Sequence, residues 1–304
     1  MSIDLVVPKE VELPTLLDEL RKLSWASADV LMAYARGSEP PYGFPKSLTV
    51  EEGGDGPVSA ADMAVNELLI SGLKDNLAFK EWDILSEETS KEKTFQQDNY
   101  KKDWCWILDP LDGTKDFLQG SENYAVHIAL AYKKKPKIGI VLIPEKNELW
   151  FGIVGIGAWF ENRDGSKNHF SFSDRLDISK LILVSSKNHQ QSKLNNLLST
   201  LCFGETKKIG SVGCKVVSIL RGEADVYISL SGKTSPKDWD MAAPHALIEA
   251  AGGMFSHADG KNLVYQETNY SQSGCLIASH GKSHQKICQK AMDFFSLEEP
   301  KYFV

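Results

Sequence analysis

The residues best suited to chemistry lie in one short segment, Asp109-Pro-Leu-Asp112-Gly-Thr114. It follows directly on the apolar run Trp104–Leu108, which predicts a buried strand. Carboxylates at the end of a strand can converge on one point, and hard divalent cations prefer such oxygen ligands. If a helix starts here, the amides of Gly113 and Thr114 point outward as an anion site. The same six residues would then supply both the ligands of a metal ion and the amides that donate hydrogen bonds to a phosphate.

Other interpretations of this segment can be compared by spacing. An EF-hand loop needs acids at alternating positions and a Glu eleven residues after the first acid, but Leu111 and Gly120 stand at such positions. Phosphatases that form an aspartyl-phosphate place their two Asp residues one residue apart, whereas two residues separate Asp109 from Asp112. A covalent aspartyl intermediate is therefore disfavoured. The plain alternative is a turn that caps a helix, because Asp, Pro and Gly are ordinary turn residues.

Three more acidic residues could complete such a site. Glu87 comes directly after a short predicted strand that contains Asp83–Leu85, and Asp62 and Asp240 each lie in the first turn of a predicted helix. Taken singly, Glu87 is explained as a solvated acid, and the two Asp residues as acids that complement a helix dipole. Their occurrence in one chain with the Asp109–Thr114 segment favours a shared site.

The elements that must position these residues form two mixed halves. In the first half, amphipathic helices are predicted over Val11–Ala35 and after Ser59, and a loop over Glu39–Gly56. A series of strands follows the acidic segment: Tyr124–Tyr132, Pro136–Ile143, Glu148–Ile153 and Gly157–Glu161. A polar linker covers residues 162–177, and strands and helices then alternate. We expect a mixed α/β protein with an N-terminal domain over residues 1–170 and a C-terminal domain over residues 171–304.

Composition and charge limit the class of protein. The 304 residues are 42% apolar and 25% charged, which is typical of globular proteins and long enough for two domains. No apolar run reaches the roughly 18 residues of a membrane span, and Met1–Pro14 lacks the pattern of a secretory signal. The net charge of −7 argues against a nucleic acid polymer as partner. The five cysteines form no C-x-x-C motif, so we expect reduced thiols and a cytoplasmic location.

The acidic motifs resemble those of the inositol monophosphatase superfamily in their sequences and in the order in which they occur. The resemblance extends from about Val58 to the last predicted strand. The resemblance implies a layered α/β/α/β/α sandwich of the inositol monophosphatase/fructose-1,6-bisphosphatase type. It implies that two or three Mg²⁺ ions are held by four acids and one carbonyl, those of Glu87, Asp109, Asp112, Asp240 and Leu111. It also implies that Asp62 and Thr114 form a catalytic dyad that activates the attacking water.

Within the superfamily, three segments resemble the 3′(2′),5′-bisphosphate nucleotidases. Lys115-Asp-Phe117 follows D-G-T, where inositol monophosphatases usually have a residue and then Asn-Phe. Val184–His189 and Ile209–Lys215 resemble the segments that hold the nucleotide, although Lys187 replaces Arg, Ser186 replaces Thr and Ser211 stands where Gly is common. The resemblance implies that the substrate-binding residues are Gly113, Thr114, Ser186, His189, Ser211 and Lys215.

The resemblance therefore implies a Mg²⁺-dependent phosphomonoesterase that removes the 3′-phosphate of adenosine 3′,5′-bisphosphate, giving AMP and phosphate. The 5′-phosphosulfate relative of that nucleotide is a further possible substrate. An inositol or sugar phosphatase, such as one acting on fructose 1,6-bisphosphate, would use the same metal ligands and is the alternative within catalysis. A non-catalytic metal- or nucleotide-binding scaffold is disfavoured, because every acidic residue of the motif is present. The expected partner is thus a small phosphorylated nucleotide, and the sequence makes no prediction of the oligomeric state.

Overall fold

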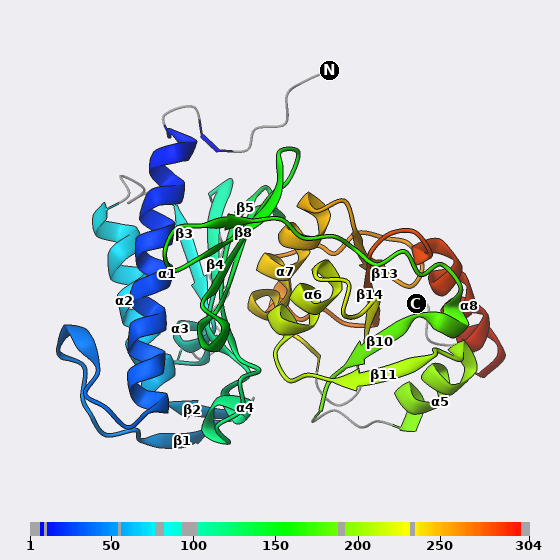
Figure 1. Ribbon diagram of the computed structural model, residues 1–304, viewed down its shortest axis with the longest axis horizontal. Helices are drawn as coiled ribbons and strands as arrows, with labels where there is room; N and C mark the ends of the chain where they lie inside the picture. The colour runs from blue at the N-terminus through cyan, green and yellow to red at the C-terminus, as the bar shows by residue number, and fades with distance from the viewer. Residues whose placement is uncertain are drawn as a thin grey trace.

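The computed structural model describes residues 7–8, 11–53, 56–76, 82–92, 102–187, 192–231 and 235–298. In this part of the chain, helices and sheets alternate in five layers, helix–sheet–helix–sheet–helix (Figure 1). The expected mixed α/β class and layered sandwich are therefore confirmed. Three apolar cores lie between the layers, because each sheet buries both of its faces.

Two long helices form the first layer, α1 (Leu13–Ala35) and α2 (Ala60–Asn76). The apolar residues of α1 recur at helical spacing, so that Leu16, Leu20 and Leu31 share one buried face. This face packs with α2 against one face of the larger sheet. The first core therefore joins the N-terminal helices to the strand that carries the acidic segment.

The larger sheet has seven strands in the order β3-β4-β5-β6-β7-β8-β9, and only the β3–β4 pair is parallel. Its strand β4 is buried along its whole length, because helices cover both faces of the sheet at this position. The strands are β3 (Asp83–Ser86), β4 (Trp104–Asp112), β5 (Ala125–Tyr132), β6 (Lys135–Ile143), β7 (Glu148–Ile153), β8 (Gly157–Asn162) and β9 (Lys167–Asn168).

The middle layer consists of α6 (Val212–Leu220) and α7 (Asp238–Ala250), which lie between the two sheets in Figure 1. Every residue of α6 is buried, which explains its nearly continuous apolar sequence. Both helices belong to one core with the inner faces of both sheets. The expected division at residue 170 stays a prediction, and the two halves share this core.

The second sheet has five strands in the order β11-β10-β12-β14-β13. The strands are β10 (Ile182–Ser185), β11 (Glu205–Lys208), β12 (Val226–Leu230), β13 (Met254–His257) and β14 (Cys275–Ser279). The last layer covers its outer face with α5 (Ser192–Leu201) and α8 (His284–Glu298), through a core of their apolar faces. Single 3₁₀ turns occur at Pro41–Gly43, Pro144–Lys146, Ile178–Lys180 and Thr268–Tyr270.

Three short elements surround the acidic segment, and two of them differ from expectation. A hairpin, β1 (Val50–Gly53) and β2 (Gly56–Ser59), leads directly into α2, and its strand β1 lies within the segment 39–56, for which the sequence indicated a loop. The helix α3 (Glu87–Glu92) begins where β3 ends. The helix expected after the acidic segment is α4 (Thr114–Leu118), which follows Gly113 in the left-handed conformation (φ 97°).

The helix α7 lies directly on the backbone of the larger sheet. A Cβ atom on Gly139 of β6 would be 2.2 Å from the carbonyl oxygen of Ala243. One on Gly152 of β7 would be 2.4 Å from the Cα atom of Leu247. Small residues at these positions therefore let α7 approach closely, and α7 carries the predicted ligand Asp240.

We expect Gly152→Ala to destabilise the protein by about 1–3 kcal/mol, because the added methyl group overlaps helix backbone that cannot rotate away. Urea unfolding followed by circular dichroism would measure the loss. An unchanged midpoint would contradict the close approach of α7 to β7.

Candidate active site

A bulge in β4 brings Asp109 and Asp112 to the same side of the sheet. Side chains three residues apart on a regular strand point to opposite faces. Here Asp109 pairs with His127 and Asp112 with Ala125, so that three steps on β4 match two steps on β5. The extra residue in β4 turns the side chains of Asp109 and Asp112 to the same side of the sheet. Pro110, which has no N–H to donate, lies within the bulge. The strand therefore continues past Leu108, where the sequence indicated a break.

Three of the predicted metal ligands meet at this point. One carboxylate oxygen from each of Asp109, Asp112 and Asp240 lies within 4.8 Å of the other two. Asp109 and Asp112 are buried and Asp240 is partly exposed. Asp109 Oδ1 accepts a hydrogen bond from the Leu111 amide at 3.1 Å, whereas its buried Oδ2 has no hydrogen-bond partner in the described part of the chain. A carboxylate oxygen that accepts no hydrogen bond from the described residues, such as Asp109 Oδ2, is available as a ligand for a cation.

The N-terminus of α6 holds Asp112. Its Oδ2 accepts hydrogen bonds from the Ser211 hydroxyl at 2.6 Å, from the Val212 amide at 2.6 Å and from the Gly213 amide at 3.1 Å. The first amides of a helix have no partner within the helix and carry its positive dipole end, so they stabilise the ionised carboxylate. Asp112 thereby links the larger sheet to the middle layer.

The other acids are placed by the ends of helices. Asp240 lies in the first turn of α7, and its Oδ2 accepts a hydrogen bond from the Lys237 amide at 2.6 Å. Glu87 is the first residue of α3 and lies near enough to act on the charge of Asp109. Asp240 therefore lies where the sequence predicted it, in the first turn of a helix, whereas Glu87 follows the predicted strand but begins a helix that was not predicted.

The electrostatics of the cluster are unfavourable without a cation. Burial raises the pKa of Asp109 well above its usual range, and repulsion by Glu87, Asp112 and Asp240 raises it further. The pKa of Asp240 is raised by burial and then by the charges of Asp112 and Glu87. The residues therefore fit a divalent cation, because a hard cation removes this repulsion and takes oxygen ligands of this kind.

Asp62 and Thr114, the two residues of the predicted dyad, lie in contact beside the cluster. Thr114 Oγ1 is 3.0 Å from Asp62 Oδ1 and 3.1 Å from the Leu111 carbonyl oxygen, both of which can accept its proton. Asp62 Oδ2 accepts hydrogen bonds from the amide and the hydroxyl of Ser59, at 2.8 and 2.5 Å. Burial is the main reason that the pKa of Asp62 is raised to about 6. A carboxylate of this pKa is suited to accept a proton near neutral pH.

The predicted substrate-binding residues are placed around the same region. Gly113 lies next to Ser211, since a Cβ atom on it would be 3.5 Å from that of Ser211. Ser186 follows β10 and is partly exposed. Lys215 is buried, and its Nζ donates to the Gly210 carbonyl at 2.5 Å. His189 lies outside the described residues, and the roles toward a nucleotide of these five residues and of Thr114 stay predictions.

Sequence reasoning missed the contact that His127 makes with the cluster. Its Nε2 is 3.2 Å from Asp112 Oδ2, and its Nδ1 is 4.0 Å from Asp109 Oδ2. Burial lowers the pKa of His127, which favours the neutral ring with a single N–H, and the Trp239 carbonyl oxygen lies 3.4 Å from Nδ1, where it can accept that proton. A Cβ atom on Gly213 would be 2.3 Å from His127 Nε2, so a side chain at this position of α6 would collide with the imidazole. This glycine was the feature of the sequence that could have indicated a close neighbour.

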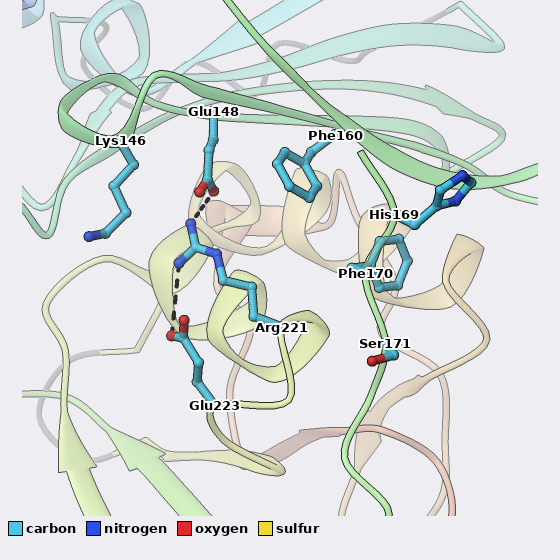
Figure 2. A pocket seen from close by; sticks show the side chains of 8 residues that line it. All are labelled: Lys146, Glu148, Phe160, His169, Phe170, Ser171, Arg221 and Glu223. Carbon is cyan, nitrogen blue, oxygen red and sulfur yellow. Dashed lines mark hydrogen bonds and ion pairs between the residues drawn. The ribbon is translucent and has the colours of Figure 1, made fainter. Parts of the chain in front are cut away.

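A separate cavity of about 670 Å³ lies at the opposite end of α6 (Figure 2). Arg221 points between Glu148 and Glu223 and pairs with both. Its guanidinium also lies over the Trp150 ring. The cation is therefore neutralised by the protein itself, and the cavity is not part of the acidic site. It is lined by Lys146, Glu148, Phe160, His169, Phe170, Ser171, Arg221 and Glu223.

Comparison with known proteins adds an independent line of evidence. The model of the inositol monophosphatase family matches residues 16–294. A protein of Salmonella typhimurium named 3′(2′),5′-bisphosphate nucleotidase CysQ is 30% identical over 250 residues, which cover 82% of this chain and 94% of the relative. A protein of Buchnera aphidicola with the same name is 32% identical over 213 residues, 69% of this chain and 74% of the relative.

The fold has counterparts among solved structures. An inositol monophosphatase (IMPase) of Thermotoga maritima superposes with a TM-score of 0.72 at 21% identity, covering 93% of this chain and 99% of that one. In the described part of this chain, no helix has the length and apolar character needed to cross a membrane.

We expect Asp109→Asn to abolish Mg²⁺-dependent turnover without unfolding the protein. The amide weakens cation binding and removes a repelled buried charge, so the melting temperature measured in EDTA rises. Mg²⁺ titration followed by thermal melting would measure both effects. Asp75→Asn, which removes a charge from an exposed position, is the control. Near-normal turnover of Asp109→Asn at saturating Mg²⁺ would contradict the metal assignment.

We also expect the metal-free protein to lose stability as the pH rises. Burial raises the pKa of Asp62 from 3.8 to about 6, so the folded state holds its proton more tightly than the unfolded chain. The stabilising contribution is complete below pH 4 and is lost as the pH rises through 6, at a cost of about 3 kcal/mol.

Urea unfolding in EDTA at pH 4 and pH 8 would measure this loss, with Asp62→Asn as the reference that cannot ionise. The difference in unfolding free energy between wild type and Asp62→Asn should change by about 3 kcal/mol across that range. A constant difference would show that Asp62 titrates as an ordinary carboxylate.

Proposed function

The chain belongs to the inositol monophosphatase family of phosphatases, and we propose that it is a Mg²⁺-dependent 3′(2′),5′-bisphosphate nucleotidase. Its substrate would be adenosine 3′,5′-bisphosphate, which it would convert to AMP and phosphate. Enzymes of this family depend on metal ions, and the buried carboxylate cluster supplies suitable ligands. Two or three Mg²⁺ ions, with Glu87 and the Leu111 carbonyl as further ligands, are part of the proposal.

One observation supports this substrate class. Three segments that resemble the nucleotidases lie in contact although they are far apart in the sequence. The ammonium of Lys187 is 2.7 Å from Asp116 Oδ1, and a Cβ atom on Gly210 would be 1.9 Å from Asp116 Oδ2. The relatives from Salmonella and Buchnera, both named as bisphosphate nucleotidases, support the same substrate class.

Bound Mg²⁺ would neutralise the carboxylates, hold the scissile phosphate, stabilise the leaving oxygen and activate a water. The chain itself orients that water. Since Thr114 Oγ1 donates its proton toward Asp62, its lone pairs remain available to accept one from the water. Ser59 fixes Asp62 through two hydrogen bonds, and Asp62 takes the proton in the end. The attack would be direct, without a covalent phosphoenzyme.

An inositol phosphatase is the second candidate, because the solved structure from Thermotoga maritima carries that name and shares the fold. The metal cluster would serve either reaction. Phosphate release from adenosine 3′,5′-bisphosphate, its 5′-phosphosulfate relative, inositol 1-phosphate and fructose 1,6-bisphosphate distinguishes the two. The proposal requires the highest kcat/KM for a nucleotide, and a higher value for inositol 1-phosphate would overturn it.

We expect Thr114→Ala to lower kcat by about 10²–10⁴-fold, because the water loses the hydroxyl that orients it. KM and the Mg²⁺ dependence should change little. Thr114→Ser keeps the hydroxyl and should retain most of the rate, which makes it the matched control. Steady-state phosphate release would measure both variants. An unchanged kcat with a raised KM would instead assign Thr114 to ground-state binding.

A further inference from the structure

A buried carboxylate that the proposed mechanism does not use lies beside the site. Asp116 follows Thr114 by two residues on α4, and only 2% of it is exposed. Its Oδ1 accepts a hydrogen bond from Lys187 Nζ at 2.7 Å, and the same ammonium donates to the Ser121 hydroxyl at 3.4 Å. Asp116 and Lys187 are 71 residues apart, so the pair joins the helix after the acidic segment to the end of β10.

Gly210 gives the carboxylate room to make this contact. A Cβ atom at this position would lie 1.9 Å from Asp116 Oδ2 and 2.5 Å from its Cγ. The carbonyl oxygen of Gly210 in turn accepts a hydrogen bond from the ammonium of Lys215 at 2.5 Å. Asp116 is therefore enclosed by the two segments that carry the predicted substrate residues, and its charge is opposed by cations from both.

The two lysines differ in what they can offer to a ligand. An ammonium has three N–H donors, and Lys187 directs two of them at Asp116 and Ser121. Its side chain is 35% exposed, so the third donor can reach a ligand that enters from solvent. Lys215 is 2% exposed, donates to Gly210 and lies over the Tyr227 ring. Lys187 is thus the better-placed cation for an arriving anion.

We propose that Asp116 is a positioning residue that holds Lys187 ready for the substrate phosphate that the metal site does not bind. It thereby sets the preference for substrates with two phosphates, an inference that rests on the proposed nucleotidase function. A free lysine side chain samples many rotamers, and fixing one of them on binding costs entropy. The Asp116–Lys187 ion pair restricts those rotamers before the substrate arrives, which strengthens binding.

The two members of the pair should not be equivalent. Replacing Asp116 by Asn leaves the ammonium of Lys187 able to bind the phosphate, but the lysine side chain then loses more conformational entropy on binding. Replacing Lys187 by Gln leaves a buried carboxylate without its closest cation, and that charge repels the phosphate. Lys187→Gln should therefore impair binding more than Asp116→Asn does.

The experiment compares adenosine 3′,5′-bisphosphate with 3′-AMP, which has only the phosphate that is removed. We expect Asp116→Asn to raise KM for the bisphosphate about 10-fold and Lys187→Gln to raise it about 100-fold, the order of a charge-assisted hydrogen bond. The kcat values and both constants for 3′-AMP should stay near those of the wild type. Lys115→Gln, an exposed charge removed one residue from Asp116, is the control and should change neither KM.

Other outcomes separate this inference from the proposed function. Equal losses on both substrates, or an unchanged KM for the bisphosphate in both variants, would overturn the positioning role of Asp116. Melting temperatures measured in Mg²⁺ identify a variant that simply unfolds. If Asp116→Asn unfolds, Asp116→Glu takes its place, because it keeps the charge but moves the carboxylate relative to Lys187 and Gly210, and an unchanged KM for the bisphosphate in that variant would overturn the positioning role. A wild type that does not prefer the bisphosphate to inositol 1-phosphate would contradict the nucleotidase function itself.

Discussion

Mutual repulsion among buried carboxylates is the constraint around which this structure is arranged. Oxygen atoms of Asp109, Asp112 and Asp240 lie within 4.8 Å of one another, where like charges destabilise the fold. Each acid is held by the backbone, through a bulge in β4, the first amides of α6 or the first turn of α7. The protein thus maintains a site that is unfavourable by itself and that a divalent cation would stabilise.

The middle layer connects this site to the stability of the whole molecule. Both α6 and α7 lie in a core that the two sheets share, and each carries part of the acidic cluster's environment. Glycines in β6 and β7 let α7 lie on the backbone of the larger sheet. Because the acids of the cluster come from the larger sheet and from the middle layer, the cluster forms only when these layers are packed together. Metal affinity and tertiary packing are therefore expected to change together.

The chemistry and the substrate preference depend on different parts of α4 and its neighbours. Thr114, at the start of α4, faces Asp62 and the acidic cluster. Asp116, two residues later, turns toward Lys187 and Gly210. One short helix thus connects the region proposed for the phosphate that reacts to the region proposed for the phosphate that does not. The ion pair could therefore change without altering the acids of the cluster.

Much of the fold could be predicted from the sequence because its signals are local. The helices α1 and α2 and the strands β5 to β8 follow from apolar spacing and turn residues, and their bounds agree within a few residues. The strands β1, β11 and β13 were not predicted, because each is short and β11 is mostly polar. Such strands are stabilised by pairing with a neighbour, which the local sequence does not encode.

The same distinction applies to the candidate site. The identity of the acids, the order in which they occur and the family they resemble were available in the sequence alone. The bulge that turns Asp109 and Asp112 to one side, the contact of His127 with Asp112 and the Asp116–Lys187 pair were decided by the tertiary structure. Each depends on strand register or on contact between residues tens of positions apart. A sequence specifies such contacts only through the packing of the whole chain, and for that reason they could not be predicted from local patterns.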